Sequence, residues 1–110
     1  MRGGLDLPEK VGHAIALLLE NLKRRYEDGE VYLHGSYARG DWLEDSDVDL
    51  IVVSDGFEGI EPAKRIALVR ALAPKDVAFE ILAYTLKEFE EAKGRSIVIE
   101  DASTYWAKLL

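Results

Sequence analysis

The sequence predicts one domain of the α/β or α+β class, built around a single sheet. Segments with helical and strand periodicity follow one another in the order helix, strand, strand, helix, strand, helix, which is typical of helices packed on one sheet. The 110 residues are enough for one compact domain, and the 48% apolar content is enough for one hydrophobic core. No internal repeat or low-complexity tract divides the sequence.

The chain is expected to begin with a flexible stretch, residues 1–7, and to form a domain over residues 8–110. The first stretch contains two glycines and has no apolar period. A helix is predicted from Pro8 onward, because apolar side chains then recur at helical spacing. We expect Asp28 and Gly29 to end it. The apolar residues of this pattern are Val11, Ile15, Leu18, Leu22 and Tyr26.

Two strands are predicted on either side of a polar loop. Residues 31–34 form a short strand that runs into the pair Gly35-Ser36, and residues 37–40 form a short helical turn. A polar loop follows, over residues 42–46. The continuous apolar run within residues 48–54 then predicts a buried strand.

The second half of the chain alternates again between helix and strand. Residues 60–72 carry a wide apolar helical face, which Pro74 ends, and residues 77–84 form the third strand. Thr85 is suited to cap the next helix, because Glu88 three residues later completes a capping-box pattern.

The C-terminal part allows two interpretations. The helix after Thr85 is predicted to run to about Lys93 and to end at Gly94. Residues 97–102 then fit a short helix, whereas residues 105–110 fit either a last strand or a second helix.

Composition excludes several classes of function. A net charge of −7 argues against a generic nucleic-acid binder, although Mg²⁺ can offset the repulsion between carboxylates and nucleotide phosphates. Without cysteine there is no disulfide and no cysteine-rich zinc site, which fits a cytoplasmic protein. No apolar run approaches the roughly 20 residues that span a bilayer, and residues 1–8 lack the apolar region of a signal peptide.

The pair Gly35-Ser36 is a candidate phosphate-binding turn. Glycine lets the backbone approach a ligand without a Cβ in the way. Ser36 can cap the following helical turn or donate its hydroxyl to a phosphate oxygen, beside the partial positive charge of a helix N-terminus. Taken alone, such a pair more often forms an ordinary turn.

Asp47 and Asp49 are candidate metal ligands. Spaced i, i+2 at the start of an apolar run, they project from one face of a strand. Mg²⁺ commonly uses one or two carboxylates together with substrate phosphates. Asp47 can equally be a loop residue, but Asp49 lies between Val48 and Leu50, where a carboxylate needs a partner or a metal.

Glu80 is the candidate for a third carboxylate. In the predicted strand 77–84 it has the parity of Asp76, and beside the Asp47/Asp49 strand it would complete a three-carboxylate cluster. Such a cluster holds two metals, or one metal and a general base. The alternatives are a solvated strand face, or Asp76 in place of Glu80.

Together these residues resemble the signature of the nucleotidyltransferase superfamily that includes DNA polymerase beta-like and kanamycin nucleotidyltransferase-like enzymes. The serine, the paired aspartates and the spacing between them all agree with it. The strings GSYARGD at 35–41 and SDVDL at 46–50 look like the small prokaryotic branch, the minimal nucleotidyltransferases (MNT). EILAYT at 80–85, with Glu88-Phe89 following, is similar to the third strand and helix start of that branch. The resemblance covers residues 31–91.

The resemblance implies an antiparallel or mixed sheet flanked by helices. It implies that Gly35, Ser36 and the N–H groups of the turn bind the triphosphate of ATP, while Asp47 and Asp49 bind two Mg²⁺ ions. The third catalytic carboxylate falls on Glu80, where the family usually has aspartate, so this chain departs from the pattern there. In the implied reaction a metal-activated hydroxyl attacks the α-phosphate, and pyrophosphate leaves.

Arg39 and His34 flank the turn and are open to more than one interpretation. Arg39 can bind a nucleotide phosphate, or it can pair with Asp41 or Glu44. His34 ends a strand beside the turn, and we interpret it as structural rather than catalytic.

The leading hypothesis is an enzyme that moves AMP from ATP onto a hydroxyl acceptor. The sequence is too short to include the acceptor-binding domain of larger superfamily members, so we expect a homo-oligomer interface or a separate protein to bring the acceptor. Minimal nucleotidyltransferases often pair with HEPN-domain proteins, so the resemblance implies a toxin–antitoxin system in which this chain is the antitoxin and modifies its toxin.

Two alternatives stay open. One is a nucleotide-binding antitoxin or interaction module with a weak or inactive site. The other is a transferase that acts on a small molecule such as an aminoglycoside.

Overall fold

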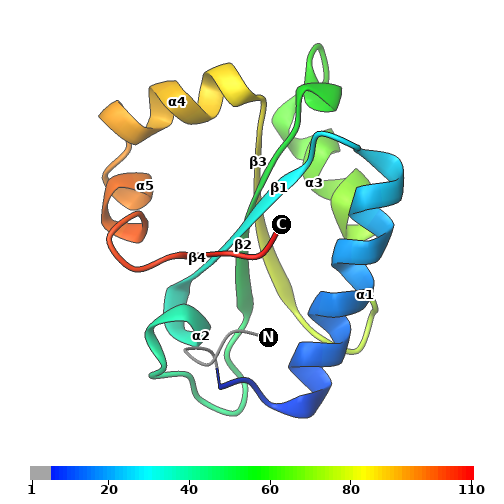
Figure 1. The fold of residues 1–110 in the computed structure, drawn as a ribbon, viewed down its shortest axis with the longest axis vertical. Coiled ribbons are helices and arrows are strands. Elements are labelled where there is room, and N and C mark those ends of the chain that lie inside the picture. The colour runs from blue at the N-terminus through cyan, green and yellow to red at the C-terminus, as the bar shows by residue number, and fades with distance from the viewer. Residues whose placement is uncertain (1–5) are drawn as a thin grey trace.

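A computed structural model describes residues 6–110 and shows one four-stranded mixed sheet with helices on both faces (Figure 1). The strand order is β3-β2-β1-β4, with β1 at Glu30–His34, β2 at Val48–Val53, β3 at Phe79–Tyr84 and β4 at Ala107–Lys108. β1 runs antiparallel to β2 and β4, whereas β2 and β3 are parallel. The predicted fold class is therefore confirmed.

Helices cover both faces of the sheet. On one face lie α1 (Glu9–Arg25) and α3 (Pro62–Arg70), and on the other lie α4 (Leu86–Arg95) and α5 (Ile97–Ala102) (Figure 1). A short helix, α2 (Gly35–Arg39), follows β1 directly at one end of the sheet.

The two faces of the sheet bury separate apolar clusters. Alternate residues of β2 divide between them, because successive side chains of a strand point to opposite faces. Val48, Leu50 and Val52 pack with α1 and α3 in the larger cluster. Ile51 and Val53 pack with Phe89 of α4 and Ile99 of α5.

The first helix forms where its apolar period predicts it. Pro8 precedes α1, and the buried side chains form one stripe on its inner face. Three basic residues occupy its last turn, where positive charge is favourable to the helix dipole. The helix ends at Arg25, before the predicted stop at Asp28 and Gly29, because Tyr26 already has extended backbone angles.

Other boundaries differ from the sequence-based prediction in informative ways. The third strand begins at Phe79 rather than at residue 77, since pairing with β2 starts only there. The prediction that α4 ends at Gly94 was wrong. The helix continues to Arg95 because the Ser96 N–H still donates to the Ala92 carbonyl, and Ser96 then caps α5.

The two ends of the chain complete the comparison. The short helix predicted at residues 97–102 is confirmed, and the chain after it forms a two-residue strand rather than a second helix. Most of the predicted flexible start, residues 1–7, lies outside the described residues, but Leu7 packs against the core. Within residues 6–110 no helix is long and apolar enough to cross a membrane.

Arg65 of α3 ties both helical layers to the end of β3. Its guanidinium is almost completely buried, with a side-chain exposure of 6%. It donates to the carbonyls of Ile60 and Ala83 and to both carboxylate oxygens of Glu88. Glu88 also accepts from the Thr85 N–H, which completes the predicted capping box of α4. The hydrogen bonds from Arg65 lower the pKa of Glu88 to about 2.

Replacing Glu88 with glutamine should destabilise the domain and flatten its response to acid. Because the folded pKa of Glu88 is lowered, its contribution to stability is complete above about pH 4.5 and is lost as pH falls towards about 2. Since the Glu88 side chain is 41% exposed, we expect a loss of only about 1–2 kcal/mol at pH 7.

Urea unfolding at pH 7 and pH 3 measures both effects. Glu90→Gln is the matched control, because Glu90 lies on the same helix and its pair with Lys93 is exposed. Equal losses in the two variants at pH 7 would contradict the role given to the Arg65–Glu88 pair.

Candidate nucleotide and metal site

Three polar side chains form a row across the sheet at the end where α2 begins. Strand register pairs His34 of β1 with Asp49 of β2, and Asp49 with Glu80 of β3. Paired residues lie on one face, so all three share the face that Ile51 and Val53 occupy further along the strand. The row brings together residues that are separated by as many as 46 positions in sequence.

Gly35 places the α2 turn directly against the Asp49 carboxylate. Its φ of +72° is in the left-handed region, and a Cβ at this position would lie 2.0 Å from the Asp49 Oδ2 atom. No other residue type fits there without displacing the carboxylate. The contact explains why glycine is needed at this position, which sequence reasoning had attributed to approach of a phosphate.

Ser36 lies in the first turn of α2 rather than at its cap. The helix begins at Gly35, its N-cap is His34, and no side chain caps it. The prediction that Ser36 caps this turn was therefore wrong, because the turn starts one residue earlier than expected. Ser36 is half-buried and is the second residue of α2.

Asp49 is a half-buried carboxylate in an environment that disfavours its charge. Burial raises its pKa, and the nearby carboxylates of Glu80 and Asp47 raise it further, while Arg39 acts in the opposite direction. Burial and charge account for the whole shift, and no hydrogen bond from residues 6–110 stabilises the ionised carboxylate. An ionised Asp49 is therefore short of positive charge.

Asp47, two residues before Asp49, and Glu80, which pairs with Asp49 in the β2–β3 register, are both exposed. Asp47 precedes β2 rather than belonging to it, since the strand begins at Val48. Asp47 and Glu80 line one pocket of about 330 Å³, together with Arg70 of α3. Sequence reasoning missed Arg70, because only the packing of α3 beside β3 brings it to this pocket.

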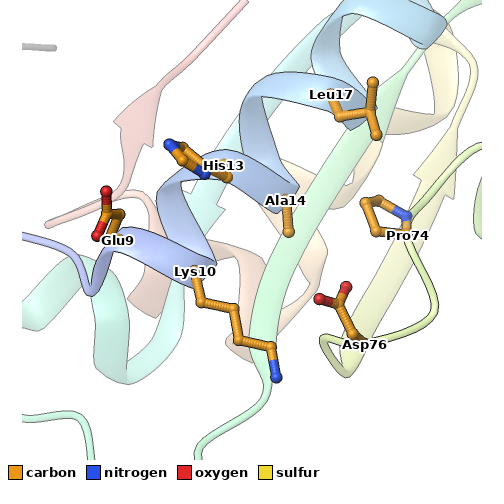
Figure 2. A pocket seen from close by; sticks show the side chains of 7 residues that line it. All are labelled: Glu9, Lys10, His13, Ala14, Leu17, Pro74 and Asp76. Carbon is orange, nitrogen blue, oxygen red and sulfur yellow. The ribbon is translucent and has the colours of Figure 1, made fainter.

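Asp76 lies elsewhere and does not join the row. It precedes β3, so the expectation that it shares a strand face with Glu80 was wrong. Figure 2 shows it beside α1, in a groove of about 430 Å³ that also contains Lys10 and His13. The full lining of this groove is Glu9, Lys10, His13, Ala14, Leu17, Pro74 and Asp76.

Asp47, Asp49 and Glu80, called the carboxylate row from here on, have the chemistry to bind a hard divalent cation that also binds an anionic substrate. Its donors are carboxylate oxygens, which Mg²⁺ prefers, and Asp49 carries charge that its surroundings leave uncompensated. Within residues 6–110, however, no three His, Asp or Glu side chains converge closely enough to enclose a metal ion. A cation at this row would therefore need phosphate oxygens and water to complete its coordination.

Arg39 makes one of its two predicted pairings and one contact that the sequence did not indicate. Its Nε donates to Asp41 Oδ2 at 3.2 Å, so the pairing with Asp41 is present and that with Glu44 is not. Its Nη1 donates to the hydroxyl of Tyr105 at 3.0 Å. Both partners raise the pKa of Arg39, and the hydrogen bond to Asp41 has the larger effect. Tyr105 is 66 positions away in sequence, so no local pattern pointed to it.

Sequence comparison connects the chain with one family. The family described as "Nucleotidyltransferase domain" matches residues 15–105, which include the whole carboxylate row and the α2 turn. A protein of Methanocaldococcus jannaschii named "Putative protein adenylyltransferase MJ0604" is 43% identical over 44 residues. That match covers 38% of this chain and 44% of the relative, so it spans less than half of the relative's length.

Solved structures resemble the fold as a whole. A structure described as "putative nucleotidyltransferase" is 28% identical and has a TM-score of 0.56, covering 90% of this chain and 99% of its own. A second, from Sulfolobus solfataricus, has 22% identity and a TM-score of 0.55 over 78% and 82% of the two chains. BolA1 from Arabidopsis thaliana also matches, with 22% identity and a TM-score of 0.53 over 74% and 98%. The last two show similarity of fold alone.

Alanine at Gly35 should disrupt the site, whereas alanine at Gly40 should not. Both glycines have positive φ, so both substitutions strain the backbone, at a cost of about 1–3 kcal/mol. Only at Gly35 does the added methyl also collide with the Asp49 carboxylate, while nothing lies within 4 Å of it at Gly40.

Thermal melting and Mg²⁺-dependent binding of ATP measure these two effects separately. We expect both variants to melt at lower temperature and only Gly35→Ala to lose ATP binding by tenfold or more. Similar affinity for ATP in the two variants would contradict the coupling between Gly35 and Asp49.

Proposed function

Because the chain belongs to the nucleotidyltransferase domain family, we propose that it transfers AMP from ATP to a hydroxyl group on a partner protein. The observation that carries the proposal is the Asp49 carboxylate, half-buried near two other carboxylates and in contact with the α2 turn. Such a carboxylate is unfavourable in the protein alone and becomes favourable once a cation and a phosphate group are bound.

In the proposed site, Asp47, Asp49 and Glu80 hold Mg²⁺, and two ions are expected. Bound there, Mg²⁺ supplies charge neutralisation at the phosphates and activates the attacking hydroxyl. Gly35 keeps side-chain atoms out of the approach to the turn. Ser36 donates its hydroxyl to a phosphate oxygen, and the N–H groups of the α2 turn face the same anion.

The reaction forms one bond and breaks one. The acceptor oxygen attacks the α-phosphorus, a new O–P bond forms, and the bond from that phosphorus to the bridging oxygen of the β-phosphate breaks. Pyrophosphate leaves. We assign to Glu80, which is exposed and pairs in register with Asp49, the role of accepting the proton of the hydroxyl. Its side chain is one methylene longer than the aspartate usual in the family, and that length lets it reach outward from the strand.

A protein acceptor is supported by the relative from Methanocaldococcus jannaschii, whose name specifies a protein adenylyltransferase. We further propose that the acceptor is a HEPN-domain toxin and that this chain acts as its antitoxin. Both points extend the resemblance to minimal nucleotidyltransferases. In a binding module with an inactive site, the carboxylate row would bind Mg²⁺ and ATP without transfer, so one experiment separates the two functions.

The test incubates the chain with Mg²⁺, ATP and a HEPN-domain protein encoded beside it. Label in the α-phosphate of ATP should appear on the partner, and label in the γ-phosphate should not. Asp49→Asn should reduce transfer by 10²-fold or more, because the variant lacks the central carboxylate of the row. Ser36→Ala should weaken ATP binding by about tenfold with little change in melting temperature.

Asp76→Asn is the matched control, because it removes a carboxylate that lies outside the row. It should leave transfer unchanged. Equal transfer by the wild type and Asp49→Asn would contradict the proposed mechanism. ATP binding without transfer would favour the inactive binding module.

A further inference from the structure

Arg39 is held from two sides by residues of different parts of the chain. As the last residue of α2, it donates through Nε to Asp41, two residues later. Through Nη1 it donates to Tyr105, in the segment between α5 and β4. The guanidinium carbon also lies 5.3 Å from the centre of the Tyr105 ring, within the range of a cation–π contact. Together these contacts restrict a side chain that is 45% exposed.

The guanidinium retains donors for a further ligand. Arginine carries five N–H donors in a planar fork, and the bonds to Asp41 and Tyr105 occupy two of them. A planar group with several remaining donors matches the geometry of a phosphate. The contacts that restrain Arg39 therefore leave several of its N–H donors available for a ligand.

Arg39 shares one face of α2 with Ser36, the residue proposed to bind the triphosphate. It follows Ser36 by three residues, and residues spaced i, i+3 are neighbours on one helix face. Its positive charge favours the ionised form of Asp49, against the effects of burial and of the nearby carboxylates on the pKa of that residue.

Tyr105 is itself fixed between two anchored elements. On its N-terminal side, the Ala102 carbonyl at the end of α5 accepts hydrogen bonds from the N–H groups of Tyr105 and Trp106. After it, Trp106 packs on Tyr32 and Phe89 with ring centres 4.7 and 5.6 Å apart, and β4 pairs with β1. The backbone on both sides of Tyr105 is therefore anchored, which restricts where its side chain can contact Arg39.

We propose that Tyr105 is a positioning residue of the nucleotide site, which orients Arg39 to bind the triphosphate of ATP. This inference rests on the proposed function and deepens it. It adds the C-terminal segment to a site that is otherwise built from α2, β2 and β3. An arginine restrained before binding loses less side-chain freedom when the phosphate arrives, and that difference is gained as affinity.

A double-mutant cycle tests the proposal with α,β-methylene-ATP and Mg²⁺ as the probe, measured by calorimetry. We expect Tyr105→Ala to weaken binding of the probe by about three- to fivefold. Tyr105→Phe, which keeps the ring but not the hydroxyl, should weaken it by about twofold. In an Arg39→Ala background, Tyr105→Ala should have no further effect. Thr104→Ala is the matched control, since Thr104 bonds only within its own turn, to the Asp101 carbonyl.

A second measurement does not depend on nucleotide binding. In the free protein, the Nε–H resonance of Arg39 should move on Tyr105→Ala and stay in place on Thr104→Ala, because only the former removes the ring beside the guanidinium.

The outcomes separate this inference from the function it rests on. A wild-type chain that does not bind the probe would overturn both. Binding that is unchanged in Tyr105→Ala, or weakened equally with and without Arg39, would overturn the positioning role alone.

Discussion

The site depends on one unfavourable feature, a half-buried carboxylate that the surrounding protein does not neutralise. Asp49 lies near Asp47 and Glu80, and burial and the charges of these two carboxylates both raise its pKa. At neutral pH this arrangement costs folding stability, since the ionised form is disfavoured relative to the unfolded chain. The rest of the domain keeps Asp49 in that position. Under the proposed function, a cation bound together with an anionic substrate offsets this cost.

The scaffold around Asp49 is built so that the carboxylate has little freedom to move. β2 is an inner strand, with β1 and β3 bonded on either side of it, and its apolar residues anchor both clusters. At Gly35 the α2 turn packs against the carboxylate so closely that a Cβ would collide with it. At the other end of β3, the pair between the buried Arg65 and the partly exposed Glu88 holds α3 and α4 against the strand that carries Glu80. Paired strands and a tight turn thus hold the polar groups on regular elements of the fold, as the proposed function requires.

The parts of the site that are local in sequence could be predicted from it, and the parts that depend on tertiary packing could not. The glycine-serine turn and the paired aspartates are close together in sequence, and their residue types already limit the chemistry. Glu80 could be placed by strand parity, and the parallel register of β2 and β3 puts it beside Asp49. The same reasoning failed for Asp76, because parity applies only inside a strand and β3 begins three residues later. Tyr105 and Arg70 had no sequence signal, since packing between distant segments brings Tyr105 to Arg39 and Arg70 to the pocket lined by Asp47 and Glu80.

The location of a bound metal–nucleotide complex tests the central claim most directly. Mn²⁺ with ATP, titrated into isotopically labelled protein, broadens the amide resonances of nearby residues. The account predicts that broadening is strongest at Gly35, Asp49 and Glu80 and weaker at Asp76 and His13, which lie in the groove beside α1. Broadening centred on that groove, with the carboxylate row unaffected, would contradict it.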